Sequence, residues 1–180
     1  MSPERAQAHQ GHLVRLVRNR LGAHVCLSAT ALPDGDTFVV ERARLVELVA
    51  FLKRDPDADL SLLVDITAID RTPRTPRFEV RWRMRSPRLG YRATFVVHVE
   101  EDDAVIPTLV PHWAGAESLE RELNEMFGVY PDGHPHLRPL LLYTDLVGHP
   151  LRRDYRASKQ QPLVPLLQDE KPPVLIEEAP

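Results

Sequence analysis

The spacing of apolar residues divides the first 128 positions of this 180-residue chain into helical and extended segments. Helical spacing of three and four recurs in residues 4–21, 41–54 and 117–127. In the last segment the apolar stripe consists of Leu119, Leu123, Met126 and Phe127. Gly128 follows directly and suits the left-handed position that ends a helix. Glu117, Arg121 and Glu125 are spaced by four, which predicts an exposed charge ladder.

Alternating or continuous apolar runs predict the strands. Residues 25–30 and 37–40 flank a turn cluster and predict a hairpin, with Cys26 inside its first strand. Residues 60–70 are apolar on both faces, which is typical of a central strand. Residues 78–84 and 91–99 alternate, predicting an antiparallel pair. The pattern predicts an α+β fold, with helices packed on one mixed, largely antiparallel sheet and an extended, proline-rich C-terminal docking tail.

Two further segments complete the organisation that we expect. Residues 106–113 predict a short helical turn between Pro107 and Pro111, which places Trp113 as a packing residue before the helix at 117. Asp65 and Asp70 are five positions apart on one strand, so they lie on opposite faces about 16 Å apart and are unsuited to joint acid/base work. We therefore expect them to be solvated at the strand end or to cap a turn.

Proline sets the C-terminal part apart. Nine of the 17 prolines lie in the last 50 residues, where they disfavour helices and central strands. The apolar residues at 140–143 and 151 need burial, and a partner chain would supply it economically. We expect an α+β domain at 1–128, an extended docking segment at 129–155, and a polar tail at 156–180 that is at most partly ordered without a partner.

Composition narrows the function classes. The formal net charge is −3, from 23 Lys+Arg against 26 Asp+Glu, and there is no strong basic block, so nucleic acid is not an expected partner. Twenty of the cations are arginine, which fits bidentate interface ion pairs or codon bias. Cys26 is the single cysteine, so no iron–sulfur cluster is expected in this chain. We expect no spanning helix and no signal peptide, hence a soluble cytoplasmic protein.

Histidines and carboxylates near the helix end allow a metal hypothesis. They are His134, His136, His149, Asp132, Asp145 and Asp154. Their spacing matches no standard zinc site, and interface or turn packing is the favoured interpretation. The sequence contains no phosphate-cradling glycine motif and no nucleophile motif, which disfavours a self-contained enzyme. A stand-alone metal-dependent hydrolase is the alternative of another class.

Several motifs in a fixed order resemble one family. They include Asp65-Ile66-Thr67-Ala68-Ile69-Asp70, Glu120-Arg121-Glu122, Met126-Phe127-Gly128, Gly133-His134-Pro135, Leu137-Arg138 and Gly148-His149-Pro150-Leu151-Arg152-Arg153-Asp154-Tyr155. Over residues 40–155 the chain resembles the 30 kDa subunit of respiratory complex I, the proton-pumping NADH-quinone oxidoreductase. Glu125 stands where aspartate is usual, and Leu146 replaces a tryptophan.

The resemblance implies a structural subunit of the peripheral arm, without a cofactor or active site of its own. The expected neighbours are the large 49 kDa-type subunit, beside the quinone site, and iron–sulfur subunits. The iron–sulfur clusters, FMN and quinone belong to those partners. The expected location is the cytoplasmic side of the inner (plasma) membrane, peripheral and without a direct membrane span. An equivalent subunit of a membrane-bound hydrogenase or formate-oxidising complex is the alternative.

The same resemblance, together with the proline-rich backbone, assigns fifteen residues to a partner interface. They are Glu120, Arg121, Glu122, Gly133, His134, Pro135, Arg138, Gly148, His149, Pro150, Leu151, Arg152, Arg153, Asp154 and Tyr155. Guanidinium groups in this segment need carboxylates or carbonyls from elsewhere. For Arg152 and Arg153 two other interpretations are open: an exposed basic turn, or an internal pair with Asp154 or a domain carboxylate.

Overall fold

The computed structural model describes residues 11–143 and 146–156. The helices are α2 (His12–Leu21), η1 (Ala23–Val25), η2 (Arg42–Arg44), α3 (Leu45–Arg54) and α4 (Ala116–Phe127). The strands are β1 (Ser28–Leu32), β2 (Gly35–Val39), β3 (Leu62–Asp70), β4 (Phe78–Arg85), β5 (Arg92–Val99), β6 (Val105–Pro107) and β7 (Tyr130–Asp132). Two of the expected helices appear nearly as predicted, and the first begins at His12. Residues 4–10 of that prediction lie outside the described residues.

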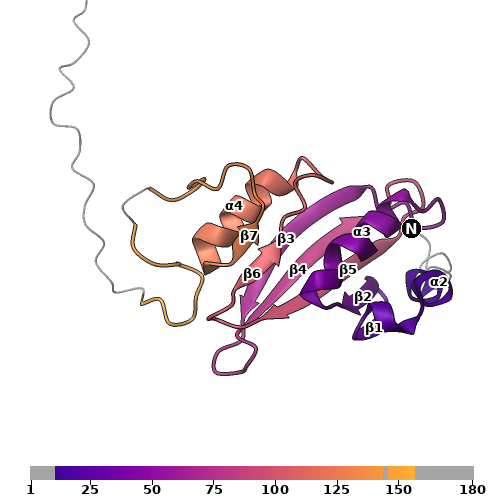
Figure 1. The fold of residues 1–180 in the computed structure, drawn as a ribbon, viewed down its shortest axis with the longest axis horizontal. Helices are drawn as coiled ribbons and strands as arrows, with labels where there is room; N and C mark the ends of the chain where they lie inside the picture. The colour runs from indigo at the N-terminus through magenta and orange to yellow at the C-terminus, as the bar shows by residue number, and fades with distance from the viewer. Residues whose placement is uncertain (1–10, 144–145, 157–180) are drawn as a thin grey trace, which may run out of the picture.

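Five strands form one sheet in the order β1-β2-β5-β4-β3. All neighbours are antiparallel except β2 and β5, which are parallel, so the sheet is mixed and largely antiparallel as predicted. The inward side chains of β4 and β5 pack with the apolar faces of α2, α3 and α4 in a single core, and the intervening positions are polar except for Val96. Figure 1 shows α3 in front of the strands, running roughly along them, and α4 further along, next to β6 and β7. The core therefore lies on one face of the sheet.

The position of β3 differs from the prediction. It is an edge strand, not a central one, and pairs only with β4 among the described strands. Its register shifts between Leu63 and Asp65, so the alternation is broken by an irregularity that edge strands often carry. Leu62, Val64 and Ile69 are exposed as a result. Apolar residues on both faces therefore indicated burial that residues 11–143 and 146–156 do not supply.

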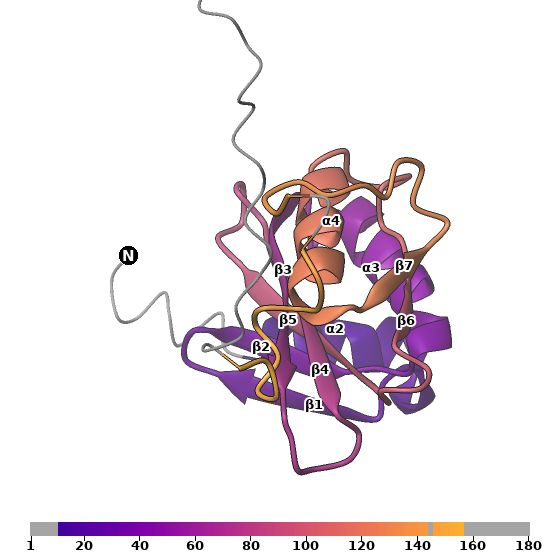
Figure 2. The same ribbon diagram turned by 90° about the vertical axis from the view of Figure 1, so that its left-hand side faces the viewer.

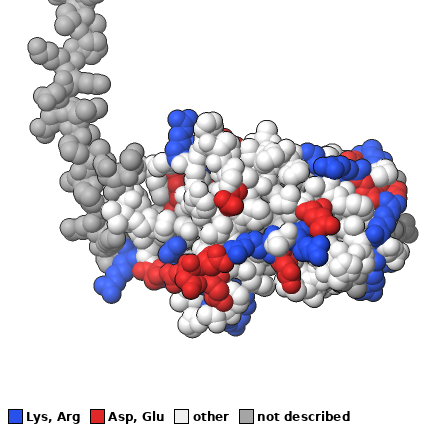
Figure 3. Space-filling view, viewed as in Figure 1, with Lys and Arg blue, Asp and Glu red and all other residues white. Residues whose placement is uncertain are grey.

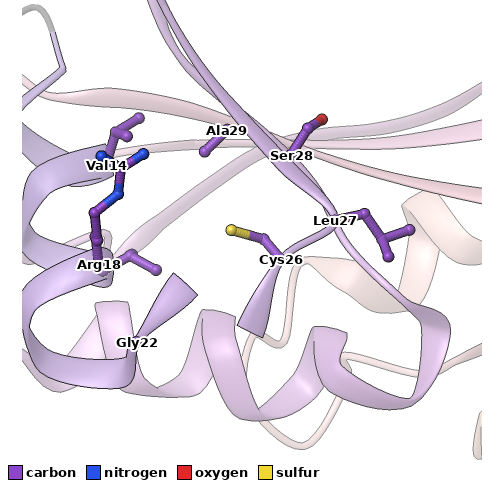
Figure 4. Close-up of a pocket in the computed structure, with 8 residues that line it drawn as sticks. Val14, Arg18, Gly22, Cys26, Leu27, Ser28 and Ala29 are labelled. Atoms are coloured by element: carbon purple, nitrogen blue, oxygen red, sulfur yellow. The ribbon is translucent and has the colours of Figure 1, made fainter. Parts of the chain in front are cut away.

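The hairpin of β1 and β2 is confirmed, with Leu32 opposite Gly35. The placement of Cys26 inside its first strand is wrong, because β1 begins two residues later, at Ser28. Cys26 is half-buried beside a cavity of about 140 Å³, with its sulfur directed toward α2 (Figure 4). Burial raises the pKa of the Cys26 thiol, and Arg18 opposes the shift only weakly. A thiol with a raised pKa is a poor nucleophile at neutral pH.

A second, two-stranded sheet joins the segments on either side of α4. Here β6 and β7 run parallel, and β6 occupies the start of the segment 106–113 for which a helical turn was predicted. Trp113 packs just before α4 as expected. Its side chain is buried, and its indole N–H donates to the carbonyl of Ser61 at 2.9 Å. The Lys53 ammonium lies 4.6 Å from its ring centroid. These contacts hold the start of α4 against β3 and α3.

Candidate docking surface

The helix α4 is buried on two sides, and only one of them is apolar. Leu123 and Phe127 pack into the core. Arg121 and Glu125 are also buried, with 8% and 9% of their surface exposed, so the predicted exposed charge ladder is wrong. The covering segment consists of residues 133–143 and 146–155, here named the strap, which runs over α4 in both views (Figure 1 and Figure 2). The ladder spacing is real, but its charges bind the strap and not water.

Arg121 holds the first half of the strap. Its guanidinium donates to two consecutive carbonyls, from Nε to Arg138 at 2.9 Å and from Nη2 to Pro139 at 2.8 Å. Its Nη1 lies 3.2 Å from the Glu117 carboxylate one turn earlier. The planar guanidinium presents several donors in a fixed fork, which suits two carbonyls on one extended strand. The strap backbone, which has no sheet neighbour here, is satisfied by a helix side chain.

Glu125 binds backbone donors of the strap, as Arg121 binds backbone acceptors. Its two carboxylate oxygens accept the backbone N–H groups of Leu140 and Leu141, the second at 3.0 Å. Hydrogen bonds to an ionised acceptor are stronger than neutral ones. Arg121 and Glu125 therefore fix four consecutive strap residues, 138–141, from adjacent turns of one helix.

The second half of the strap caps the C-terminus of α4. A helix leaves its last carbonyls without intrahelical donors. Here the ring Nδ1 of His149 donates to Glu125 at 2.8 Å, the N–H of Leu151 to Met126 at 3.1 Å, and Nε of Arg152 to Phe127 at 2.6 Å. The positive charge of Arg152 at this end also complements the helix dipole. Three successive orphan carbonyls are thus occupied by the strap.

Gly128 makes this approach possible. It ends α4 in the left-handed conformation, with φ 72° and its N–H bonded to Asn124 at 2.8 Å, as the sequence predicts. A Cβ at this position would lie 2.5 Å from Nε2 of His149 and would also collide with the guanidinium of Arg152. Glycine is therefore required both by the backbone and by the strap.

The end of the strap is anchored at the far end of β3. Asp70, whose side chain is only 1% exposed, accepts hydrogen bonds from Arg77 at 2.9 Å, from Thr72, and from the N–H of Arg153 at 2.9 Å. Arg77 also pairs with Asp154 at 2.9 Å and with Glu101 at 2.5 Å. Burial would raise the pKa of Asp70, but these donors outweigh it and hold the pKa well below its ordinary value. Asp70 thus caps the turn after β3, one of the two roles expected for it.

A second carboxylate lies entirely inside the fold. Glu120 has no exposed surface and accepts the N–H of Leu109 at 2.6 Å and the hydroxyl of Thr108 at 2.5 Å. It ties α4 to the segment after β6. Burial raises the pKa of Glu120 above its ordinary value, and the two hydrogen bonds only reduce the shift.

While its backbone faces α4, the strap presents apolar side chains outward. The exposed members are Leu140, Leu141, Tyr143, Val147 and Leu151. Leu141 and Val147 are the most exposed, at 61% and 60%. This cluster is here named the strap patch. Several exposed apolar side chains on one segment are typical of interaction sites. The strap therefore binds α4 through its polar backbone and offers apolar side chains for docking.

Comparison with known proteins identifies the family. The family described as "Respiratory-chain NADH dehydrogenase, 30 Kd subunit" matches residues 38–161. This chain belongs to that family. It is 36% identical over 146 residues to the C subunit of NADH-quinone oxidoreductase from Brucella ovis, covering 81% of this chain and 71% of that protein. It is 37% identical to the protein of the same name from Dinoroseobacter shibae over 142 residues, with 75% and 66% covered.

Solved structures share the fold of this 30 kDa-family chain. One is titled a trypsin-resistant fragment (1-134) of Nqo5, with a TM-score of 0.59 and 29% identity over 69% of this chain and 98% of that one. Another belongs to an archaeal membrane-bound sulfane sulfur reductase complex, with a TM-score of 0.68 over 81% of this chain and 84% of that one. Its 22% identity supports the fold alone. None of the described helices of the present chain is long and apolar enough to cross a membrane.

The structure of this family member distributes the fifteen predicted interface residues over three environments. Glu122, Gly133, Pro135, Arg138, Gly148, Leu151, Arg153 and Asp154 are exposed; His134, His149, Pro150, Arg152 and Tyr155 are half-buried; Glu120 and Arg121 are buried. The side chains of the last two bind this chain's own backbone. Of the three interpretations for Arg152 and Arg153, the structure shows internal contacts: Arg152 lies 3.5 Å from Glu101, and Arg153 donates to the carbonyl of Thr72 at 2.7 Å. A partner contact for the exposed residues stays a prediction.

The sequence did not point to Glu125, Asp70 and Arg77 as holding the strap, or to Val147 as part of its patch. Only the apolar run at 140–143 gave a usable signal for the patch. His134 of the metal hypothesis makes other contacts. Its Nε2 donates to the backbone carbonyl of Glu117 at 3.0 Å, and its Nδ1 accepts the backbone N–H of His136. Within residues 11–143 and 146–156 no group of three or more His, Cys, Asp or Glu could hold a metal ion. Asp145 lies outside the described residues.

Proposed function

We propose that the chain is a structural subunit, without a cofactor of its own, of the hydrophilic arm of an NADH-quinone oxidoreductase, and that it docks through the strap. The family membership supports the complex. The strap patch supports the docking, because a backbone held by Arg121, Glu125 and the end of α4 presents apolar side chains without needing to order them on binding. Preorganisation of this kind lowers the entropic cost of association.

The partner that we propose is the large 49 kDa-type subunit, with the iron–sulfur subunits as neighbours. Clusters, FMN and quinone would then reside in those partners, and this chain would support electron transfer from NADH to quinone by holding the large subunit in place. We also propose a peripheral position on the cytoplasmic side of the membrane. An equivalent role in a membrane-bound hydrogenase or formate-oxidising complex is the alternative, and the subunits that co-purify with the tagged chain decide between them.

The test is a pair of matched surface substitutions in the chain expressed with its complex. Leu141→Asp changes a strap residue that is 61% exposed, and Leu27→Asp changes one that is 66% exposed outside the strap. Both isolated proteins should melt like the wild type, because exposed positions contribute little to stability. Only Leu141→Asp should lose co-purification of the large subunit. Equal recovery of the large subunit by both variants would overturn docking through the strap patch.

The absence of a cofactor is tested directly on the isolated chain. Its optical spectrum should show no visible band, and metal analysis should find well below one iron or zinc per chain. About one zinc per chain would revive the hydrolase alternative, and a flavin or cluster band would contradict a purely structural role.

A further inference from the structure

The sheet has a second face that no described helix covers. Along β4 the residues Phe78, Val80, Trp82 and Met84 point into the core, and the intervening positions point away from it. The buried apolar residues of α2, α3 and α4 all belong to the cluster on the core side. The strap packs on α4, so it also lies on that side. The opposite face of β3, β4 and β5 is therefore a separate surface.

This opposite face is rich in arginine. Arg81, Arg83 and Arg85 occupy its positions on β4, and Arg92 occupies the facing end of β5; these four residues are here named the arginine face. Two carboxylates on the same face offset part of the charge. Glu79 pairs with Arg81 at 2.5 Å and lies 3.8 Å from Arg71, and Asp65 pairs with Arg83 at 3.4 Å.

Arg85 and Arg92 have no carboxylate partner among the residues that the structure describes. They lie directly opposite each other in the β4–β5 register, and both are exposed. Neither makes an ion pair with any described residue. Like charges at directly opposed positions of an antiparallel pair are destabilising, so this arrangement costs the isolated sheet stability. A carboxylate from outside the chain would offset that cost for both guanidinium groups at once.

The surroundings favour a protein surface over a polyanion. Leu62 on β3 is directly paired with Arg85 and is 47% exposed. Thr94 on β5 is paired with Arg83. Arginine beside apolar and hydroxyl side chains is typical of protein interfaces. The acidic run at 100–103 follows β5 directly, and Figure 3 shows acidic side chains gathered at this end of the molecule. That run lies at the end of the sheet opposite to Arg85 and Arg92, so it would disfavour only a nucleic acid or an anionic membrane that spans the whole sheet.

We propose that the arginine face is a second docking surface, which receives a carboxylate-bearing surface of another protein subunit of the same complex. This inference rests on the proposed function, because it takes the partner from that complex. It differs from the strap patch in position, on the other side of the sheet, and in chemistry, since guanidinium groups and not apolar side chains carry it. The chain would then be held between two neighbours, with its core in between.

The first test reverses one charge. Arg85→Glu places a carboxylate opposite Arg92, so the isolated variant should melt at or above the wild-type temperature. In the co-expressed complex, binding to the subunit on this face should weaken at least about tenfold, because like charges at an interface cost several kcal/mol. Arg54→Glu, at an exposed arginine at the end of α3, is the matched control and should bind as the wild type does. Equal binding by both variants overturns the proposal.

The second test measures whether the arginine face is covered in the wild-type complex. Phenylglyoxal labelling of arginines, followed by mass spectrometry, should find Arg85 and Arg92 protected in the complex and reactive in the free chain, while Arg54 stays reactive in both. Unchanged labelling of Arg85 and Arg92 overturns the second surface even when the chain co-purifies with the complex. If the chain does not co-purify at all, the proposed function fails, and this inference fails with it.

Two other possible occupants of the arginine face, the chain's own residues 157–180 and a polyanion, would give different labelling results. If the arginines are already protected in the free full-length chain and become reactive when residues 157–180 are deleted, the chain covers its own face and the proposal is wrong. The proposal is also wrong if the protection in the complex disappears on nuclease treatment, or if vesicles of anionic phospholipid alone reproduce it.

Discussion

The two buried sides of α4 use different chemistry for the same task. On the core side Leu123 and Phe127 pack against the sheet by non-directional apolar contact. On the strap side Arg121 and Glu125 fix a backbone through paired hydrogen bonds of defined direction. Apolar contact tolerates some change of shape, whereas the strap side depends on matched donors and acceptors. The first side supplies most of the stability, and the second fixes the position of an irregular segment.

The largest loss of stability is expected at Phe127, on the core side of α4. Phe127→Ala removes a buried ring, 7% exposed, from the core side and should lower the free energy of unfolding by about 3 to 5 kcal/mol. Urea unfolding at equal m-value measures it. An unchanged midpoint would mean that the core side of α4 is not where the stability resides.

The second largest loss of stability is expected when Arg77 is replaced. Arg77→Ala leaves Asp70 with a buried carboxylate that lacks its charge partner, which should cost about 3 kcal/mol near neutral pH. Since the folded-state pKa of Asp70 lies below its ordinary value of 3.8, the benefit from Arg77 is complete above that pH and is lost as the pH falls below it. The stability gap between wild type and variant should therefore close on acidification. A gap that is the same at pH 3 and pH 7 would contradict the role of Asp70.

Glu125 tests the strap side. Glu125→Ala removes the acceptor of two strap N–H groups and should cost about 1 to 2 kcal/mol, mostly as local opening. Amide hydrogen exchange at Leu140 and Leu141 should accelerate, while exchange in β4 stays unchanged. Glu122→Ala, on the exposed side of the same helix, is the control and should alter neither.

The smallest effect should be at Glu120. Glutamine can accept the N–H of Leu109 through its amide oxygen and donate its amide N–H to the Thr108 hydroxyl, so Glu120→Gln should lie within about 0.5 kcal/mol of wild type at pH 7. Because the folded-state pKa of Glu120 is raised above 4.5, the wild type should lose stability relative to the variant as the pH rises through that raised value. Denaturant midpoints from pH 4 to pH 8 measure the slope. A difference that does not change with pH would place Glu120 in contact with water.

The sequence predicts the core side of α4 well and the strap side poorly, for a physical reason. Apolar periodicity records burial, and it located α3, α4, β4 and β5. It cannot record burial of a charge, so Arg121 and Glu125 appeared as solvent-facing residues. Their burial depends on a segment more than ten residues away whose proline-rich backbone offers unpaired donors and acceptors. The same limit applies to β3, where Leu62 and Val64 indicated burial that the described part of the chain does not provide.

The contact between Asp70 and the N–H of Arg153 joins residues 83 positions apart, and this separation determines when the strap forms during folding. Closing so long a loop is slow, and it is stabilised only once α4 and the β3–β4 turn already exist. We therefore expect strap closure to come late on the folding pathway. Substitutions in the strap should speed unfolding and leave the folding rate nearly unchanged. On the ribosome, the sheet and its helices can assemble before the strap emerges, and the docking element is completed only on a finished domain.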